Sequence, residues 1–277
     1  MLDTDLGKYL NDKDNLNLLK RFSSLGSTEA FDKKLFYLTK IADNEKWYYK
    51  RPNSESFSVI FYYIIHTFDR VFKQNKIFVN SDESLSVFNT GLMNKQGDEI
   101  LGVFEKSYNY NESDPLSNYW HFKTFYEEND RKFVNLSLEK PDIATYFEEY
   151  NELYFDPNIE ISLNFDHFYD DNYERLPVEL QTLDKNTARI VFNGFLDYTI
   201  KKIKRNNRIP VPQFYREKIM FLIPVNVFGT KTVVIAVEKV GERYLANTVL
   251  TMEMAYNCAR LINKPESNWL LISEKKH

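Results

Sequence analysis

The segment Leu85-Ser-Val-Phe-Asn-Thr-Gly-Leu92, continuing through Asn94-Lys-Gln-Gly-Asp98 into Glu99-Ile-Leu-Gly-Val-Phe-Glu-Lys106, decides the fold class. On either side of the central five residues the pattern changes to a period of two, which is typical of strands. The central residues include the Asn, Gly and Asp that tight hairpin turns favour. This segment therefore predicts an antiparallel β-hairpin.

Further strands are expected on both sides of this hairpin. Trp120–Tyr126 predicts a third strand, and Ile159–Phe165 alternates cleanly between apolar and polar residues. Lys218–Pro224 and Thr232–Lys239 are apolar runs of strand length, and they predict a second hairpin that is buried at least in part. The sheet should therefore be mainly antiparallel.

Helical periodicity accounts for much of the remaining chain. Residues 1–28 hold no sustained hydrophobic period. Apolar residues at helical spacing predict helices beginning near Glu29 and over residues 55–73, 142–153, 184–205 and 250–261. We expect an α+β fold, in which a mainly antiparallel sheet of hairpins is flanked by helices. We place a helical N-terminal arm at 1–40 and a single α+β domain at 41–277, although the length also allows two closely packed domains.

Composition excludes several classes of protein. The 277 residues carry a formal net charge of −4 and 43% hydrophobic residues, which is ordinary globular composition. The single cysteine, Cys258, excludes an intramolecular disulfide and any multi-cysteine metal site. The 8 glycines form neither a Walker A loop nor a Gly-x-Gly-x-x-Gly motif. With no signal peptide and no long apolar run, we expect a cytoplasmic protein without a membrane partner.

A basic segment late in the chain is the most informative feature. Seven Lys or Arg residues and one acid, Glu217, lie between Lys201 and Lys218. Such a stripe can bind phosphates while neighbouring aromatic and amide side chains contact a base. A solvated helix C-terminus, where cations meet the helix dipole favourably, is the alternative. The candidate phosphate-binding residues here are Lys201, Lys202, Arg205, Arg208, Gln213, Tyr215 and Lys218.

An acidic segment precedes it. Nine acids and no Lys or Arg lie between Glu148 and Glu174. Within it, Asp166, His167 and Asp170 are candidate catalytic residues, because carboxylates beside an imidazole can move a proton or hold Mg²⁺ or Mn²⁺. No diagnostic metal-ligand spacing is present, so the metal is left unassigned and simple exposed acids remain the alternative.

Polar residues in the predicted sheet form a third group of candidates. His121 and Lys123 should share one face of their strand and can bind phosphate, although a half-exposed strand would look the same. Asn89 and Thr90, near a strand end, can add polar contacts, or simply cap the hairpin. His66, in an apolar helix, is expected to be a core histidine. Cys258 is expected to pack on a buried helix face and not to act as a nucleophile.

Several stretches in a fixed order carry a family resemblance. They are Phe88-Asn-Thr-Gly-Leu-Met93, Val103-Phe-Glu-Lys106, Trp120-His-Phe122, Phe155-Asp-Pro-Asn158, Asn164-Phe-Asp-His167 with Asn172 and Arg175-Leu-Pro177, Val211-Pro-Gln-Phe-Tyr215, and Thr248-Val-Leu-Thr-Met-Glu-Met-Ala-Tyr-Asn-Cys-Ala-Arg260. From about residue 41 to 271 the chain resembles the bacterial family called domain of unknown function 3825. Members of that family often carry a cold-shock or LOTUS-type RNA-binding module.

The resemblance implies a connection with RNA and no particular reaction. Residues 1–40 are too few to supply a cold-shock barrel, so the domain itself or a separate RNA-binding protein would have to bind the RNA. We expect a protein that binds RNA or a nucleotide and that can act on a phosphodiester or nucleotide phosphate. A non-catalytic interaction or regulatory module in RNA metabolism is the alternative, and the oligomeric state is left open.

Overall fold

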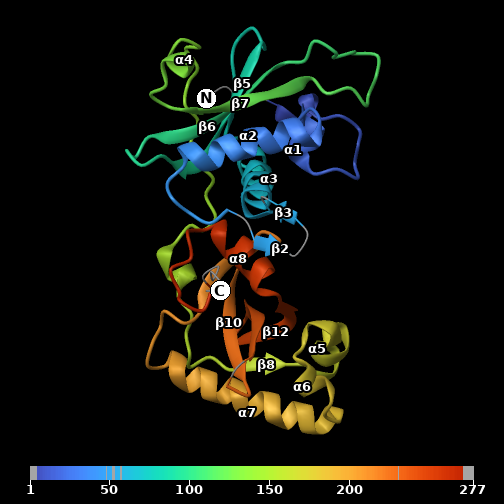
Figure 1. The fold of residues 1–277 in the computed structure, drawn as a ribbon, viewed down its shortest axis with the longest axis vertical. Coiled ribbons are helices and arrows are strands. Elements are labelled where there is room, and N and C mark those ends of the chain that lie inside the picture. Colours follow the sequence, from blue (N-terminus) through green and yellow to red (C-terminus); the bar gives the residue numbers. More distant parts are fainter. Residues whose placement is uncertain (1–4, 48, 52–53, 57, 230, 271–277) are drawn as a thin grey trace. The chain divides into compact units, whose positions relative to one another are not determined.

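The computed structural model describes residues 5–47, 49–51, 54–56, 58–229 and 231–270 (Figure 1). Its contacts divide the chain into two compact units, Met1–Thr145 and Tyr146–His277. This division differs from the predicted boundary at residue 40. Leu19 and Phe22 are fully buried in the first unit, so the segment before residue 40 contributes to a core and does not stand apart as an arm.

The first unit combines a five-stranded sheet with helices. The order of the strands in the sheet is β1-β7-β6-β5-β4, and all neighbouring pairs are antiparallel except β1–β7. The elements of this unit are η1 (Leu6–Tyr9), α1 (Leu18–Phe22), β1 (Ser23–Ser24), α2 (Thr28–Ile41), β2 (Tyr49–Arg51), β3 (Ser54–Ser56), α3 (Ser58–Lys73), β4 (Ile77–Val79), β5 (Leu85–Met93), β6 (Glu99–Lys106), β7 (Trp120–Glu127) and α4 (Arg131–Val134).

Aromatic rings fill the core between this sheet and its helices. Phe68 of α3 lies 5.2 Å from Phe88 and 5.7 Å from Phe104, measured between ring centroids. Gly102 of β6 leaves the space that the Phe88 ring occupies, because a Cβ there would lie 2.1 Å from a ring carbon. The predicted hairpin over β5 and β6 is therefore confirmed, and so is the third strand, β7.

The second unit is also built on a five-stranded sheet, with the order β8-β12-β11-β10-β9. Only the β12–β8 pair is parallel. The elements of this unit are η2 (Tyr150–Leu153), β8 (Ile161–Leu163), α5 (Phe165–Asp171), η3 (Tyr173–Arg175), α6 (Val178–Gln181), α7 (Lys185–Ile203), β9 (Val211–Tyr215), β10 (Lys218–Val227), β11 (Lys231–Val240), β12 (Arg243–Leu250) and α8 (Met252–Arg260).

Helix α7 lies against one face of this sheet. Its buried residues recur every three or four positions, and they join a core with alternate residues of β10 and β11, including Ile223 and Ile235. Each unit is thus a mainly antiparallel sheet flanked by helices, as the α+β prediction required. Within the described residues, no helix has both the length and the apolar character that crossing a bilayer would need.

Some predicted elements were wrong. The helix expected over 142–153 is extended chain followed by the short η2, because the backbone of Thr145 pairs with the side chains of Arg70 and Gln74 instead of with a helical turn. Strand β9 lies between the predicted helix and the predicted second hairpin, where no strand was expected, and its Pro212 is tolerated because β9 is an edge strand. His66 is exposed and stacks on Tyr62, so it is not a core histidine.

Candidate nucleic-acid interface

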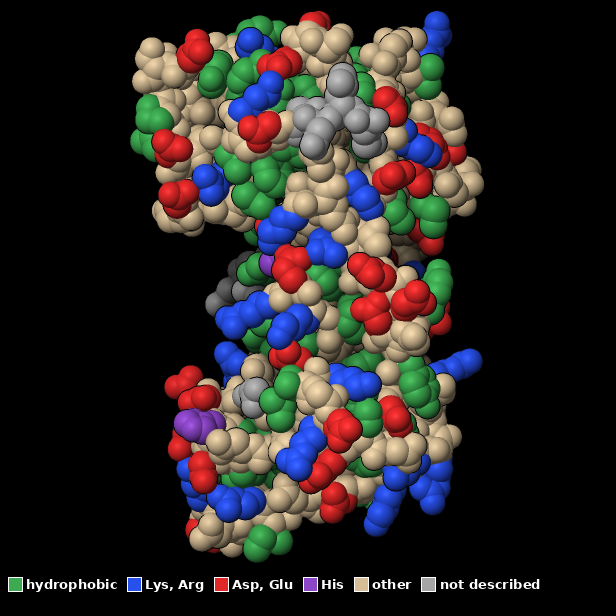
Figure 2. Space-filling model, turned by 180° about the vertical axis from the view of Figure 1, so that it is seen from behind, with side chains coloured by type: hydrophobic (Ala, Val, Ile, Leu, Met, Phe, Trp, Pro, Cys, Tyr) green, Lys and Arg blue, Asp and Glu red, His purple; other side chains and the backbone are tan. Residues whose placement is uncertain are grey.

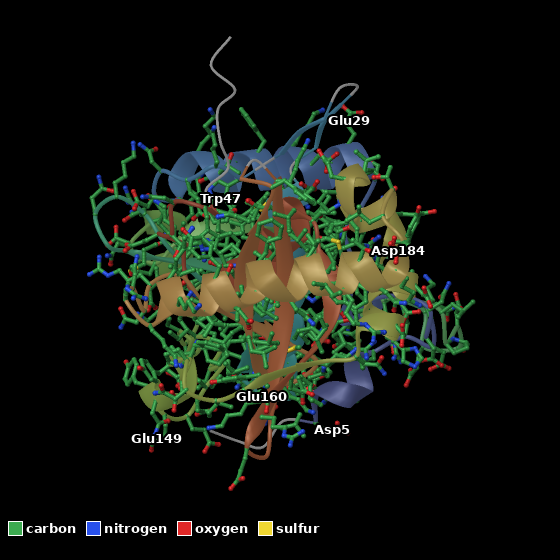
Figure 3. The ribbon with its side chains drawn as sticks, turned by 90° about the horizontal axis from the view of Figure 1, so that it is seen from below. Asp5, Glu29, Trp47, Glu149, Glu160 and Asp184 are labelled. Atoms are coloured by element: carbon green, nitrogen blue, oxygen red, sulfur yellow. The ribbon has the colours of Figure 1, made fainter. Side chains whose placement is uncertain are left out.

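Helix α7 places the basic residues of the second unit. It begins after Asp184, labelled in Figure 3, whose carboxylate accepts a hydrogen bond from the Thr187 N–H at 3.1 Å. Because one side of the helix, including Phe192 and Leu196, is buried against the sheet, the opposite side faces solvent. The predicted helix over 184–205 is confirmed, and its last turn carries the cations onto the surface.

Five cationic side chains at the C-terminal end of α7 form what we call the basic stripe. Its members are Lys201, Lys202, Lys204, Arg205 and Arg208, all exposed. Within the described residues none of the five forms an ion pair. Figure 2 shows Lys and Arg side chains projecting at the lower right, where the C-terminal half of α7 lies.

Local hydrogen bonds order the backbone under the stripe. The Arg205 guanidinium donates to the Lys201 carbonyl at 2.6 Å, and so covers part of the negative end of the helix. After the helix, Ser267 Oγ donates to the Arg208 carbonyl and Trp269 Nε1 to the Ile209 carbonyl, each at 2.8 Å. The stripe therefore continues past the helix end on an anchored loop, where the helix dipole no longer explains the cations.

The structure separates three predicted partners from the stripe. Gln213 is 1% exposed and faces the interior, where its Nε2 contacts Met220 Sδ at 4.0 Å. Tyr215 and Lys218 lie at the other end of β9, about 13 Å from Val211 at the rise of a strand. Lys218 Nζ is paired with Glu238 Oε1 at 2.5 Å. Gln213 and Tyr215 lie on the same face of β9, so the alternation along the strand does not predict that one is buried and the other exposed.

An exposed tyrosine beside the stripe was missed. Tyr198 is 55% exposed, and Lys202 Nζ lies 4.4 Å from the centroid of its ring. The sequence could have indicated this contact, because Tyr198 and Lys202 are four apart on the predicted helix and are therefore neighbours on its surface. Tyr198 thus brings an aromatic face to the cations, which is the role that Tyr215 was expected to fill.

The acidic candidates lie at the other end of α7. Asp166 Oδ1 is 2.9 Å from Arg189 Nη2 and 3.3 Å from Lys185 Nζ, and Asp170 Oδ2 is 2.8 Å from Lys185 Nζ. The hydrogen bond from Lys185 lowers the pKa of Asp166 below its usual value. These ion pairs tie α5 to the start of α7.

This arrangement keeps the acidic and basic candidates apart. Lys185 and Lys201 are separated by 16 residues of one helix, which corresponds to about 24 Å. His167 is exposed and, within the described ranges, makes no hydrogen bond. The same residues likewise contain no group of three Asp, Glu, His or Cys side chains that could hold a metal ion. The predicted catalytic residues and the basic stripe therefore do not form one site.

The candidates on β7 belong to the first unit. Lys123 Nζ is paired with Glu105 Oε2 at 2.8 Å, and this hydrogen bond raises the pKa of Lys123. Burial, with a further contribution from Lys34, lowers the pKa of His121. A lowered pKa disfavours the imidazolium form that would attract a phosphate.

Asn89 and Thr90 serve the fold of β5. Thr90 Oγ1 donates to the Ile100 carbonyl at 2.6 Å, at an irregularity in the β5–β6 register. Asn89 Nδ2 donates to Glu99 Oε2 at 3.0 Å and to the Pro141 carbonyl at 3.1 Å. Both side chains are buried and their polar atoms are used internally. The two side chains therefore stabilise β5 where its pairing with β6 is irregular.

A polar hollow of about 390 Å³ lies beside Asn89 in the first unit. Its cations are already engaged: Lys140 Nζ is 2.9 Å from Glu99 Oε2 and 2.6 Å from Glu128 Oε2. Lys76 Nζ donates to the Ile143 carbonyl at 2.8 Å. The hollow therefore offers an anion less free positive charge than the basic stripe does.

Comparison with known proteins places the chain in one family. No curated protein and no solved structure matches it. The family model described as "Domain of unknown function (DUF3825)" matches residues 38–269, which is most of the chain and includes the basic stripe. This chain belongs to the domain of unknown function 3825 family.

Proposed function

We propose that the second unit binds RNA or a nucleotide by its phosphates, through the basic stripe. The observation that carries this proposal is the set of five exposed cations that lack ion pairs among the described residues, in a chain whose net charge is −4. Each Lys or Arg that neutralises a phosphate releases condensed counterions, and this release supplies most of the affinity.

Binding without chemistry is the form of the proposal that the geometry supports. Asp166 and Asp170 of α5 are paired with Lys185 and Arg189, and Lys185 is about 24 Å from Lys201 along α7. His167 lies on the same short helix as the two carboxylates. We therefore assign these three residues no role in the binding. An interaction module in RNA metabolism is compatible with the same surface, because its ligand would meet the same cations.

A charge-removal variant tests the proposal. In Lys201→Ala/Arg205→Ala/Arg208→Ala, loss of three phosphate contacts should weaken binding of a fluorescein-labelled single-stranded RNA roughly 500-fold at 50 mM salt. Fluorescence anisotropy measures the change. The matched control, Lys33→Ala/Lys132→Ala/Lys239→Ala, removes the same charge from exposed positions elsewhere.

The control separates local contacts from net charge. If the stripe binds phosphates, the control variant keeps nearly the affinity of the parent. Equal affinities for the parent and the stripe variant would refute the proposal, and equal losses in both variants would show that only the overall charge matters.

A further inference from the structure

An aromatic group borders the basic stripe on the side nearer the sheet. Phe228, in the turn after β10, packs against Phe195 of α7 with ring centroids 5.4 Å apart and planes 71° apart. Tyr198 follows Phe195 by three residues on the same helix, so the two lie on neighbouring positions of its surface. The three rings, Phe195, Tyr198 and Phe228, are called the aromatic shelf below.

Helix geometry places the shelf and the cations side by side. A rotation of about 100° per residue fixes the order of side chains around α7. Starting beside the core, the side chains follow one another around the helix as Phe195, Lys202, Tyr198 and Lys201. The cations thus alternate with rings instead of forming a separate patch. Interleaved rings and cations allow a ligand to be held by its phosphates and by flat apolar groups at once.

The backbone of Phe228 is strained. Its φ is +50°, in the left-handed region that a bulky residue rarely adopts and that costs free energy. Asn or Gly would fit this turn position with less strain. The ring remains 41% exposed, so the burial of the rest of the ring offsets only part of this strain energy. An exposed aromatic residue at a strained turn points to a role in binding.

The ring of Tyr198 contributes little to packing. More than half of the side chain is exposed, and the ammonium group of Lys202 lies over the face of its ring. Such a cation can turn to a phosphate while the ring accepts another flat group. Alanine is the best helix former, so replacing this exposed tyrosine should leave α7 intact.

We propose that the aromatic shelf stacks the bases of single-stranded RNA while the basic stripe holds its phosphates. This inference rests on the proposed function and narrows its ligand. Bases in a duplex are already stacked and paired, so their faces are not available to the rings, whereas every unpaired base offers one. The shelf therefore selects single strands over duplexes, and RNA over a phosphate chain that lacks bases.

The test compares ligands with and without bases. The probes are a labelled single-stranded RNA of about 12 nucleotides, the same sequence as a duplex, and inorganic polyphosphate as a competitor. Tyr198→Ala should weaken binding of the single strand about 5- to 150-fold, the range for losing one stacked base, and leave the affinity for polyphosphate unchanged. Phe228→Asn should act in the same direction while retaining the circular dichroism spectrum and melting temperature of the parent.

A matched control is available in the same unit. Tyr215→Ala removes an exposed tyrosine at the far end of β9, and it should change neither affinity. If Tyr198→Ala and Phe228→Asn bind the single strand as the parent does, the shelf is refuted and the stripe stands. Equal weakening toward RNA and polyphosphate would also refute stacking. A parent protein that binds neither the single-stranded RNA nor polyphosphate at low salt would refute the proposed function itself.

Discussion

The salt dependence of RNA binding should report how many cations of the basic stripe contact phosphates. With five contacts, the logarithm of the association constant should fall against the logarithm of salt concentration with a slope of about −3.5 for a single strand. Affinity should then drop about 130-fold between 50 and 200 mM salt. Lys201→Ala/Arg205→Ala/Arg208→Ala leaves two contacts, so its slope should be about −1.4 and its drop about 7-fold.

Anisotropy titrations at four or five salt concentrations measure both slopes on the same labelled RNA. The control Lys33→Ala/Lys132→Ala/Lys239→Ala should keep a slope near that of the parent, because those side chains belong to α2, α4 and β11 and not to the basic stripe. Tyr198→Ala should lower the association constant at every salt concentration without changing the slope, since stacking releases no counterions. Equal slopes for the parent and the stripe variant would refute the assignment of phosphate contacts to these cations.

Two further predictions concern the two cores. Gly102→Ala should lower the free energy of unfolding by about 1–3 kcal/mol or more, because the added Cβ would lie 2.1 Å from the Phe88 ring. Urea titrations measure this change, and an unchanged midpoint of urea unfolding would contradict this packing. Burial raises the pKa of Cys258 to about 11. At pH 8 the folded protein should therefore hold roughly a hundred times less thiolate than an unfolded chain, and it should react with Ellman's reagent correspondingly slowly. Equal rates in buffer and in denaturant would contradict this prediction.

Periodicity in the sequence was sufficient to predict much of the architecture. The alternation in residues 85–106 corresponds to the hairpin β5–β6, and the apolar runs in 218–239 correspond to the hairpin β10–β11. The helical spacing in 184–205 corresponds to α7. The helix expected over 142–153 failed because side chains distant in sequence compete for the backbone of Thr145. Such competition leaves no trace in a local pattern.

The candidate site was predictable in its charge but not in its aromatic partners. The density of Lys and Arg after residue 200 located the stripe, because exposed cations at a helix end need no particular tertiary contact. Gln213 and Tyr215 were misplaced: both lie on the same face of β9, but Gln213 lies within the strand and is buried, whereas Tyr215 lies at its exposed end. The position of Phe228 depends on a left-handed turn and on contact with Phe195, neither of which sequence spacing encodes.

Cross-linking offers the most direct test of the account. A single-stranded RNA carrying 4-thiouridine, irradiated with the full chain and analysed by mass spectrometry, identifies the residues that touch bases. The account predicts cross-links in peptides containing Tyr198 or Phe228, and their loss when polyphosphate competes for the stripe. Cross-links confined to the acidic end of α7 near Asp166, or to the first unit, would contradict it.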